Sequence, residues 1–249
     1  MKRISNVVVA VAFICGNMVL TSDAFARERK SSGSYQGRSG GGTFQKNVNR
    51  SQGSTTKRTT WQNKRGEGSL EKHRTWDKSS GTGSYSGSLK TATDKTATWG
   101  GTVKKNDDGS FSQNGTITGP KGKTTTVDRD FTKNDDGSRS VDTVYTGQDG
   151  KTLTIDKDIT HGDGARNVTG DYSTSTGKSG TFTGTSTVED GKIVTDRSLT
   201  DQDGRTWGQN VVLDRDGNTV TRQVTNTNPW GIGKTFNQSV TVDNVTIEK

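Results

Sequence analysis

The chain has 249 residues and a formal net charge of +8, with 25% charged and only 24% hydrophobic residues. From position 27 onward, Val, Ile, Leu and Phe make up 31 of 223 residues, below the ~20% at which disorder becomes a serious expectation. This composition excludes a thick hydrophobic core, and the single cysteine, Cys15, excludes an intramolecular disulfide framework.

Residues 1–26 have the three parts of a secretory signal peptide. A basic start (KR) precedes an apolar segment at residues 7–20, and residues 24–26 (AFA) match a cleavage site. The alternative is an uncleaved anchor, which needs ~20 apolar residues to span a bilayer. We therefore expect an exported bacterial protein in the periplasm, at the cell surface or outside the cell. No transmembrane segment is expected after cleavage.

Residues 27–55 are rich in Gly and Ser and carry more basic than acidic side chains. Within them, residues 31–53 (SSGSYQGRSGGGTFQKNVNRSQG) contain few apolar side chains, and chains of this composition behave as flexible linkers. Residues 27–55 are therefore predicted to form a flexible basic arm, followed by a single β-repeat domain over residues 56–249.

Similar segments recur along the chain at intervals of 27–29 residues. Residues 121–132 read KGKTTTVDRDFT and residues 149–160 read DGKTLTIDKDIT, with a further turn signal halfway between such segments. A unit with two turns is typical of a β-hairpin, and the abundant Thr and Val favour strands. The predicted fold is all-β, a long antiparallel meander or hairpin array of about 14 to 16 strands. The sheet can be open, rolled up or folded on itself. A β-solenoid is the alternative.

The expected turns are marked mainly by glycines. Asp-Gly and Asn/Asp-x-Gly supply the positive φ that tight hairpin turns require. Both prolines, Pro120 and Pro229, fall in predicted turns, where they remove no ladder hydrogen bond. Over most of the chain the signals are 13 to 15 residues apart, at Gly40, Gly53, Gly68, Gly81, Asp94, Gly109, Gly122, Gly137, Gly150, Gly164, Gly177, Gly191, Gly204, Gly217 and Gly233.

Alternate residues of a strand lie on opposite faces of a sheet. Val127, Arg129 and Phe131 share one partly apolar face, whereas Asp128 and Asp130 share a fully wettable face. The first face cannot contact lipid, because Arg or Lys at the bilayer midplane costs ~2–4 kcal/mol. The aspartates exclude contact with lipid for the second face. The apolar face must therefore be covered by the sheet itself or by another copy.

Charge is unevenly distributed along the chain. Residues 27–105 carry a net charge of +12 and residues 106–249 a net charge of −5. Solubility alone explains such a split, but a basic half also favours contact with a polyanion. Tryptophans flanked by basic residues can stack on bases or sugar rings, or simply supply buried area. The candidate polyanion-binding residues are Lys57, Arg58, Trp61, Lys64, Arg65, Arg74 and Trp76.

Two kinds of partner follow from these patterns. An open meander has two edge strands, which template pairing with other chains unless charged residues block them. Because the N-terminal edge lies in the basic half and the C-terminal edge in the acidic half, self-association through sheet edges is one expectation. An anionic polysaccharide or an envelope surface is the other.

The sequence does not point to catalysis or to a cofactor. It contains no G-x-S-x-G, no phosphate-binding loop and no carboxylate pair that stands out from the repeat. The pairs Asp201/Asp203 and Asp214/Asp216 resemble fragments of calcium loops, but calcium requires 6–8 oxygen ligands. Asp-x-Asp-Gly is also ordinary hairpin-turn chemistry.

Three functions remain as hypotheses. The leading one is a non-catalytic, exported structural or adhesive protein of the envelope or the extracellular space. The alternative is a binding module for a polysaccharide or another anionic polymer. The third is a surface protein stabilised by divalent ions.

Overall fold

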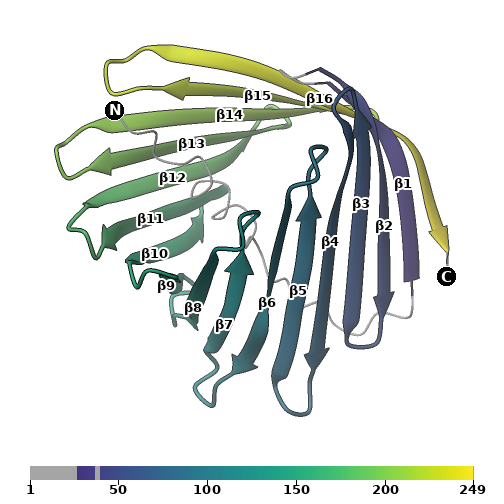
Figure 1. Cartoon of the computed structure of the whole chain (residues 1–249). Coiled ribbons are helices and arrows are strands. Elements are labelled where there is room, and N and C mark those ends of the chain that lie inside the picture. Colours follow the sequence, from purple (N-terminus) through teal and green to yellow (C-terminus); the bar gives the residue numbers. More distant parts are fainter. Residues whose placement is uncertain (1–26, 37–39, 249) are drawn as a thin grey trace.

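The computed structural model describes residues 27–36 and 40–248, which form sixteen strands and no helix. Each strand pairs with its chain neighbours in antiparallel fashion, so the meander prediction is confirmed and the solenoid alternative is wrong (Figure 1). The sheet rolls into a closed barrel. Its strands are β1 (Arg27–Gln36), β2 (Gly42–Ser51), β3 (Ser54–Asn63), β4 (Gly66–Asp77), β5 (Thr82–Lys90), β6 (Thr96–Lys105), β7 (Phe111–Thr118), β8 (Thr124–Lys133), β9 (Arg139–Gly147), β10 (Thr152–Gly162), β11 (Ala165–Thr174), β12 (Ser179–Glu189), β13 (Lys192–Asp201), β14 (Thr206–Asp216), β15 (Thr219–Thr227) and β16 (Gly233–Glu248).

Residues 27–55, predicted as a flexible arm, instead supply β1, β2 and the start of β3 within the described residues. Gly33 pairs with Phe44 in the β1–β2 ladder, so a glycine taken as a sign of flexibility serves close packing. The predicted signal peptide, residues 1–26, lies outside the described residues. In the part of the chain that the structure describes, no helix is long and apolar enough to cross a membrane.

Positive φ angles occur at the predicted turn positions, with two exceptions. The left-handed residue is Gly66 instead of Gly68, and Gly231 instead of Gly233. Gly68 lies inside β4, where an added Cβ would come within 2.4 Å of the Trp61 ring. Pro120 and Pro229 both lie in turns, as predicted.

The barrel is closed by the pairing of β1 with β16. Their ladder runs from Glu28↔Glu248 to Gln36↔Ser239, with a β-bulge at Asp243 of β16, opposite Ser32 and Gly33. A bulge bends a strand and increases its twist, and the bend helps the first and last strands to pair and close the barrel. The two edges required for association between chains are thus paired with each other among the described residues, and self-association stays a prediction.

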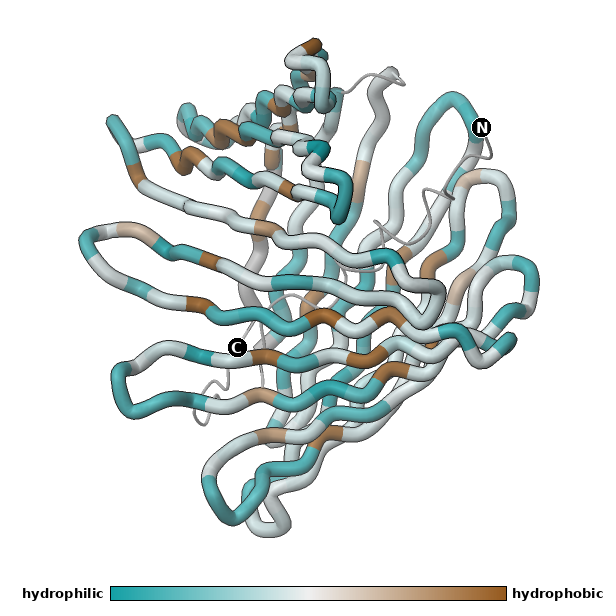
Figure 2. Tube along the Cα trace, turned by 90° about the vertical axis from the view of Figure 1, so that its left-hand side faces the viewer, coloured by the Kyte–Doolittle hydropathy of each residue, from teal (hydrophilic) through white to brown (hydrophobic). Residues whose placement is uncertain are grey.

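The barrel has a thin apolar lining. Hydrophobic residues occur one or a few at a time along the strands, while the turns are mostly hydrophilic (Figure 2). Among the described residues no large side chain is less than 2% exposed. Order therefore depends mainly on a continuous backbone ladder, in agreement with the low apolar content. The buried hydrophobic residues are Val103, Val127, Val141, Val211 and Val224.

Ring contacts identify the concave face of the sheet. Trp76 on β4 and Phe111 on β7 approach to 6.0 Å between ring centroids, although two strands lie between them. Strands are ~4.8 Å apart, so the two backbones are separated by about 14 Å along the sheet. Rings lean together in this way where a sheet bends around them. The five buried valines share this face by strand pairing, which we call the inward face.

Candidate functional site

The aromatic rings of the described strands all belong to the inward face. Strand pairing places them there because directly opposed residues share a face. The remaining described ring, Trp230, lies in the β15–β16 turn and is 79% exposed. The inward rings are Tyr35, Phe44, Trp61, Trp76, Tyr85, Trp99, Phe111, Phe131, Tyr145, Tyr172, Phe182, Trp207 and Phe236.

Many of these rings lie over a glycine of the neighbouring strand. A Cβ added to Gly87 would meet the Trp99 ring at 2.2 Å, and one added to Gly170 would meet the Phe182 ring at 2.6 Å. The missing side chain makes room for the ring on the crowded concave side, as alternating small and large residues do inside barrels. The glycines thus hold the rings against the sheet.

Charges divide by face as well. Among strand residues whose pairing defines their face, the inward face has one carboxylate, Asp201 at the end of β13. Acidic side chains otherwise point outward, together with a few cations such as Arg58 and Lys192. The inward cations are Arg29, Lys46, Arg50, Lys57, Lys72, Arg74, Lys105, Arg129, Lys133, Arg139, Lys157, Arg166, Arg197, Arg215, Arg222 and Lys234.

Inward cations crowd one another on β2, β3 and β4. Lys57 lies directly opposite Lys72. Burial lowers the pKa of Lys46, and the positive charges of Lys57 and Arg29 lower it further. Like charges held together in this way are costly, so a bound anion would relieve their repulsion.

A second part of the inward face, on β8 and β9, buries a cation. Arg129 is 7% exposed, its Nε donates to the Thr143 hydroxyl at 3.0 Å, and its Nη2 donates to the Tyr145 hydroxyl at 3.0 Å. The guanidinium also lies 5.7 Å from the Phe131 ring centroid. These partners are all neutral, so they solvate the charge without cancelling it.

A third part lies on β11, β13 and β15, where the inward face is more open to solvent. Although Arg197 is exposed, partial desolvation lowers the pKa of its guanidinium, and the positive charges of Arg222 and Arg166 lower it further. Leu199 and Trp207, on the same face, are each 38% exposed. Ligand groups can therefore reach the cations of this region.

The structure separates the seven predicted polyanion-binding residues into three places. Lys57 and Trp61 on β3 face inward, as do Arg74 and Trp76 on β4, while Arg58 faces outward. Lys64 and Arg65 lie in the turn between these strands. The inward cations Lys46, Arg129, Arg166, Arg197 and Arg222 were not predicted. Lys46, Arg129 and Arg166 lie on the same face as an aromatic residue of their own strand, whereas the strands of Arg197 and Arg222 contain no aromatic residue.

The candidate calcium residues lie at opposite ends of β14. Asp201 accepts hydrogen bonds from the backbone N–H groups of Asp203 and Arg205, both at 2.9 Å, and Asp203 pairs with the Arg205 side chain. Asp214 pairs with Lys192 at 3.1 Å, and Asp216 ends the strand. Among the described residues, no three potential metal-ligating side chains gather as a metal ion requires.

The comparisons with known proteins add no relative. No family model matches the chain, and no curated protein is similar to it in sequence. The inward face is therefore the candidate functional site on its own geometry.

Proposed function

We propose that the protein is a non-catalytic binding protein that holds an anionic polymer along its inward face. The observation that carries the proposal is the sorting of side chains by face. Among the described strand residues whose pairing defines their face, the aromatic rings and most cations share the inward side, whereas the carboxylates, apart from Asp201, point outward. This sorting by face accounts for the placement of charge better than the division into a basic and an acidic half does.

Physical chemistry favours an anion on such a face. A concave surface lined by one sign of charge focuses the electric field and concentrates the counter-ion. Exposed charges at about 4 Å interact with ~1 kcal/mol in water, so several weak contacts give useful affinity. Rings held flat against the strands add stacking surface that does not depend on salt.

Export of the protein belongs to the proposal, on the basis of the signal-peptide pattern in residues 1–26. A structural or adhesive role is compatible with binding an envelope polymer. It has less support as a separate role, because β1 and β16 are paired with each other and leave no free sheet edge among the described strands.

The test uses two consecutive residues of β3. Lys57 faces inward and Arg58 faces outward, so Lys57→Gln and Arg58→Gln remove the same charge from opposite faces. Binding to dextran sulfate is measured by isothermal titration calorimetry at rising ionic strength. We expect Lys57→Gln to weaken binding by about fivefold, equivalent to ~1 kcal/mol, and Arg58→Gln to change it by less than about twofold.

Equal losses in the two variants would mean that net charge, not the inward face, attracts the polymer. Absence of binding by the unmodified protein at low salt would refute the proposed function outright. Uncharged dextran is the control ligand, and binding should weaken with salt because exposed charges are screened.

A further inference from the structure

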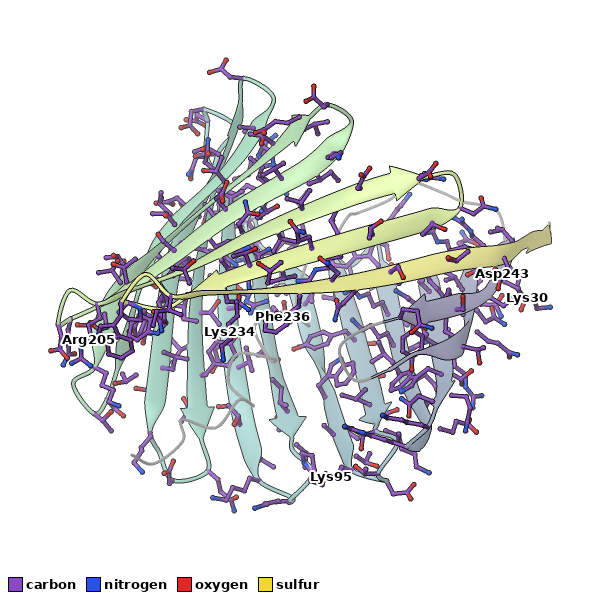
Figure 3. All side chains as sticks on the ribbon, turned by 90° about the horizontal axis from the view of Figure 1, so that it is seen from above. Lys30, Lys95, Arg205, Lys234, Phe236 and Asp243 are labelled. Atoms are coloured by element: carbon purple, nitrogen blue, oxygen red, sulfur yellow. The ribbon has the colours of Figure 1, made fainter. Side chains whose placement is uncertain are left out.

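One row of polar side chains crosses four neighbouring strands on the inward face. Each member of the row pairs with the next: Arg197 on β13 with Gln209 on β14, Gln209 with Asn226 on β15, and Asn226 with Lys234 on β16. Directly opposed residues have Cβ atoms about 4.5–5.5 Å apart. We call these four residues the amide row. Figure 3 labels Lys234, the β16 end of this row, and Phe236, which lies two residues farther along β16.

Hydrogen bonds in the amide row run in one direction. Arg197 Nη1 donates to Gln209 Oε1 at 3.5 Å, and Gln209 Nε2 donates to Asn226 Oδ1 at 2.9 Å. Each amide oxygen is thus already engaged once, while each carboxamide has two N–H donors and an ammonium has three. The capacity that remains for a ligand is mainly donors, which suits a group that only accepts hydrogen bonds.

Charge and access agree with an anionic ligand. Both ends of the amide row are cations, and Arg222 Nη1 donates to the neighbouring Gln238 Oε1 at 3.1 Å. Asp201, the inward carboxylate, accepts hydrogen bonds from turn amides near the rim. Asn226 and Lys234 are exposed, so a ligand reaches the row without rearrangement of the barrel.

The position of the Trp207 ring indicates which class of polymer the site can bind. Trp207 precedes Gln209 by two residues on the same face and is 38% exposed. A track for single-stranded nucleic acid stacks successive bases on several rings, whereas this ring stands beside a single polar row, with half-buried Phe236 on the other side. One ring next to one group of donors matches one sugar ring and its acidic substituent.

We propose that the amide row and Trp207 form a subsite for an acidic sugar unit of a polysaccharide. The carboxylate or sulfate accepts hydrogen bonds from Arg197, Asn226 and Lys234, and the sugar ring packs on Trp207. This subsite deepens the proposed function and rests on it. Carboxylated and sulfated polymers share the required chemistry, and the experiment separates them.

The experiment replaces an amide by an acid on either face. Gln209→Glu keeps an acceptor for Arg197, loses its own donors and brings a negative charge into the row. Gln223→Glu on β15 makes the same change on the outward face. Affinity for a galacturonic-acid oligosaccharide and for dextran sulfate is measured by calorimetry. We expect Gln209→Glu to bind about tenfold more weakly or worse, as loss of charged hydrogen bonds predicts, and Gln223→Glu to stay within about twofold.

Trp207→Ala provides a second readout. It should weaken binding of the oligosaccharide and leave the salt dependence of binding unchanged, because a stacking contact carries no charge. Circular dichroism checks that each variant keeps its strands. Whichever of the two acidic polymers loses more affinity in Gln209→Glu identifies the preferred oxyanion.

Three results would overturn the subsite. If Gln209→Glu matches Gln223→Glu while Lys57→Gln still weakens binding, the polymer binds elsewhere on the inward face and the proposed function stands. If oligothymidylate binds more tightly than either sugar polymer and depends on the same row, the ligand is a nucleic acid. If no anionic polymer binds, the proposed function fails together with the subsite.

Discussion

Replacing Gly87 by alanine adds one methyl group beneath an inward ring. The new Cβ would lie 2.2 Å from Trp99 Cζ2 and 2.6 Å from the Glu71 carbonyl oxygen. The ring can move by rotation of its side chain, but the carbonyl belongs to the backbone of β4 and cannot retreat without disturbing the ladder. We therefore expect a loss of stability instead of the usual gain from replacing glycine in a strand.

The magnitude follows from two opposing terms. Overpacking costs about 1–3 kcal/mol, and alanine is favoured over glycine inside a strand by about 0.5–1 kcal/mol. The net loss is about 1–2 kcal/mol in the free energy of unfolding. For a chain of this size, 1 kcal/mol shifts the melting temperature by about 2–4 °C, so Gly87→Ala should melt about 2–8 °C lower.

Thermal unfolding followed by circular dichroism measures the effect, with Gly162→Ala as the matched control. Gly162 also lies in a strand, its φ is outside the left-handed region, and an added Cβ would meet nothing within 4 Å. The control should melt at the same temperature as the unmodified protein or slightly higher. Identical melting temperatures for the two variants would contradict the close approach of the Trp99 ring and the Glu71 carbonyl to Gly87.

Three further predictions test other parts of the barrel. Asp156 lies opposite Asp142 and Asp171 on the outward face, and burial raises its pKa, with smaller contributions from these two charges. Asp156→Asn should therefore raise the free energy of unfolding by about 0.5 kcal/mol at neutral pH. A raised folded-state pKa means that the native protein binds the proton more tightly, so this advantage should vanish in urea titrations as the pH falls below the ordinary carboxyl value of 3.8. Thr143→Val should cost about 1.5–3 kcal/mol, because it removes the acceptor of the buried Arg129 Nε; a loss below 0.5 kcal/mol (about the effect of an ordinary surface change) would contradict that hydrogen bond. Millimolar calcium should leave the melting temperature almost unchanged, and stabilisation by several kcal/mol would instead indicate a tight calcium site.

The strands and most turns could be predicted from the sequence because their signals are local. A glycine at a fixed spacing and a Thr/Val alternation need no knowledge of distant residues, and Gly109 and Gly150 have the expected positive φ. Gly33 was misread for the same reason. Its neighbours along the chain are polar, and only the β1–β2 register reveals that Phe44 lies opposite it.

The candidate site was harder to predict because it depends on the relation between strands. Charge summed along the chain gives a basic half and an acidic half, whereas the structure sorts the charges of the strands by face. Residue parity within each strand already separates Arg129 from Asp128 and Asp130. Alternation along a strand separates the two faces but does not show which one is concave. Closure of the barrel decides that. The amide row also requires the register of four strands, which no single segment contains.

The pairing of β1 with β16 brings the two ends of the described chain to the same rim, with Glu28 opposite Glu248. Adjacent ends allow circular permutation, in which the ends are joined by a short linker and new ends are opened at an exposed turn. The turn at Gly150 is suitable, because nothing lies within 4 Å of an added Cβ there. In the natural order the β1–β16 ladder is the contact of longest sequence separation, and its first strand is synthesised long before its last. In the permutant that ladder becomes a local hairpin, so barrel closure would move to the β9–β10 pair and the order in which the ladders form would change.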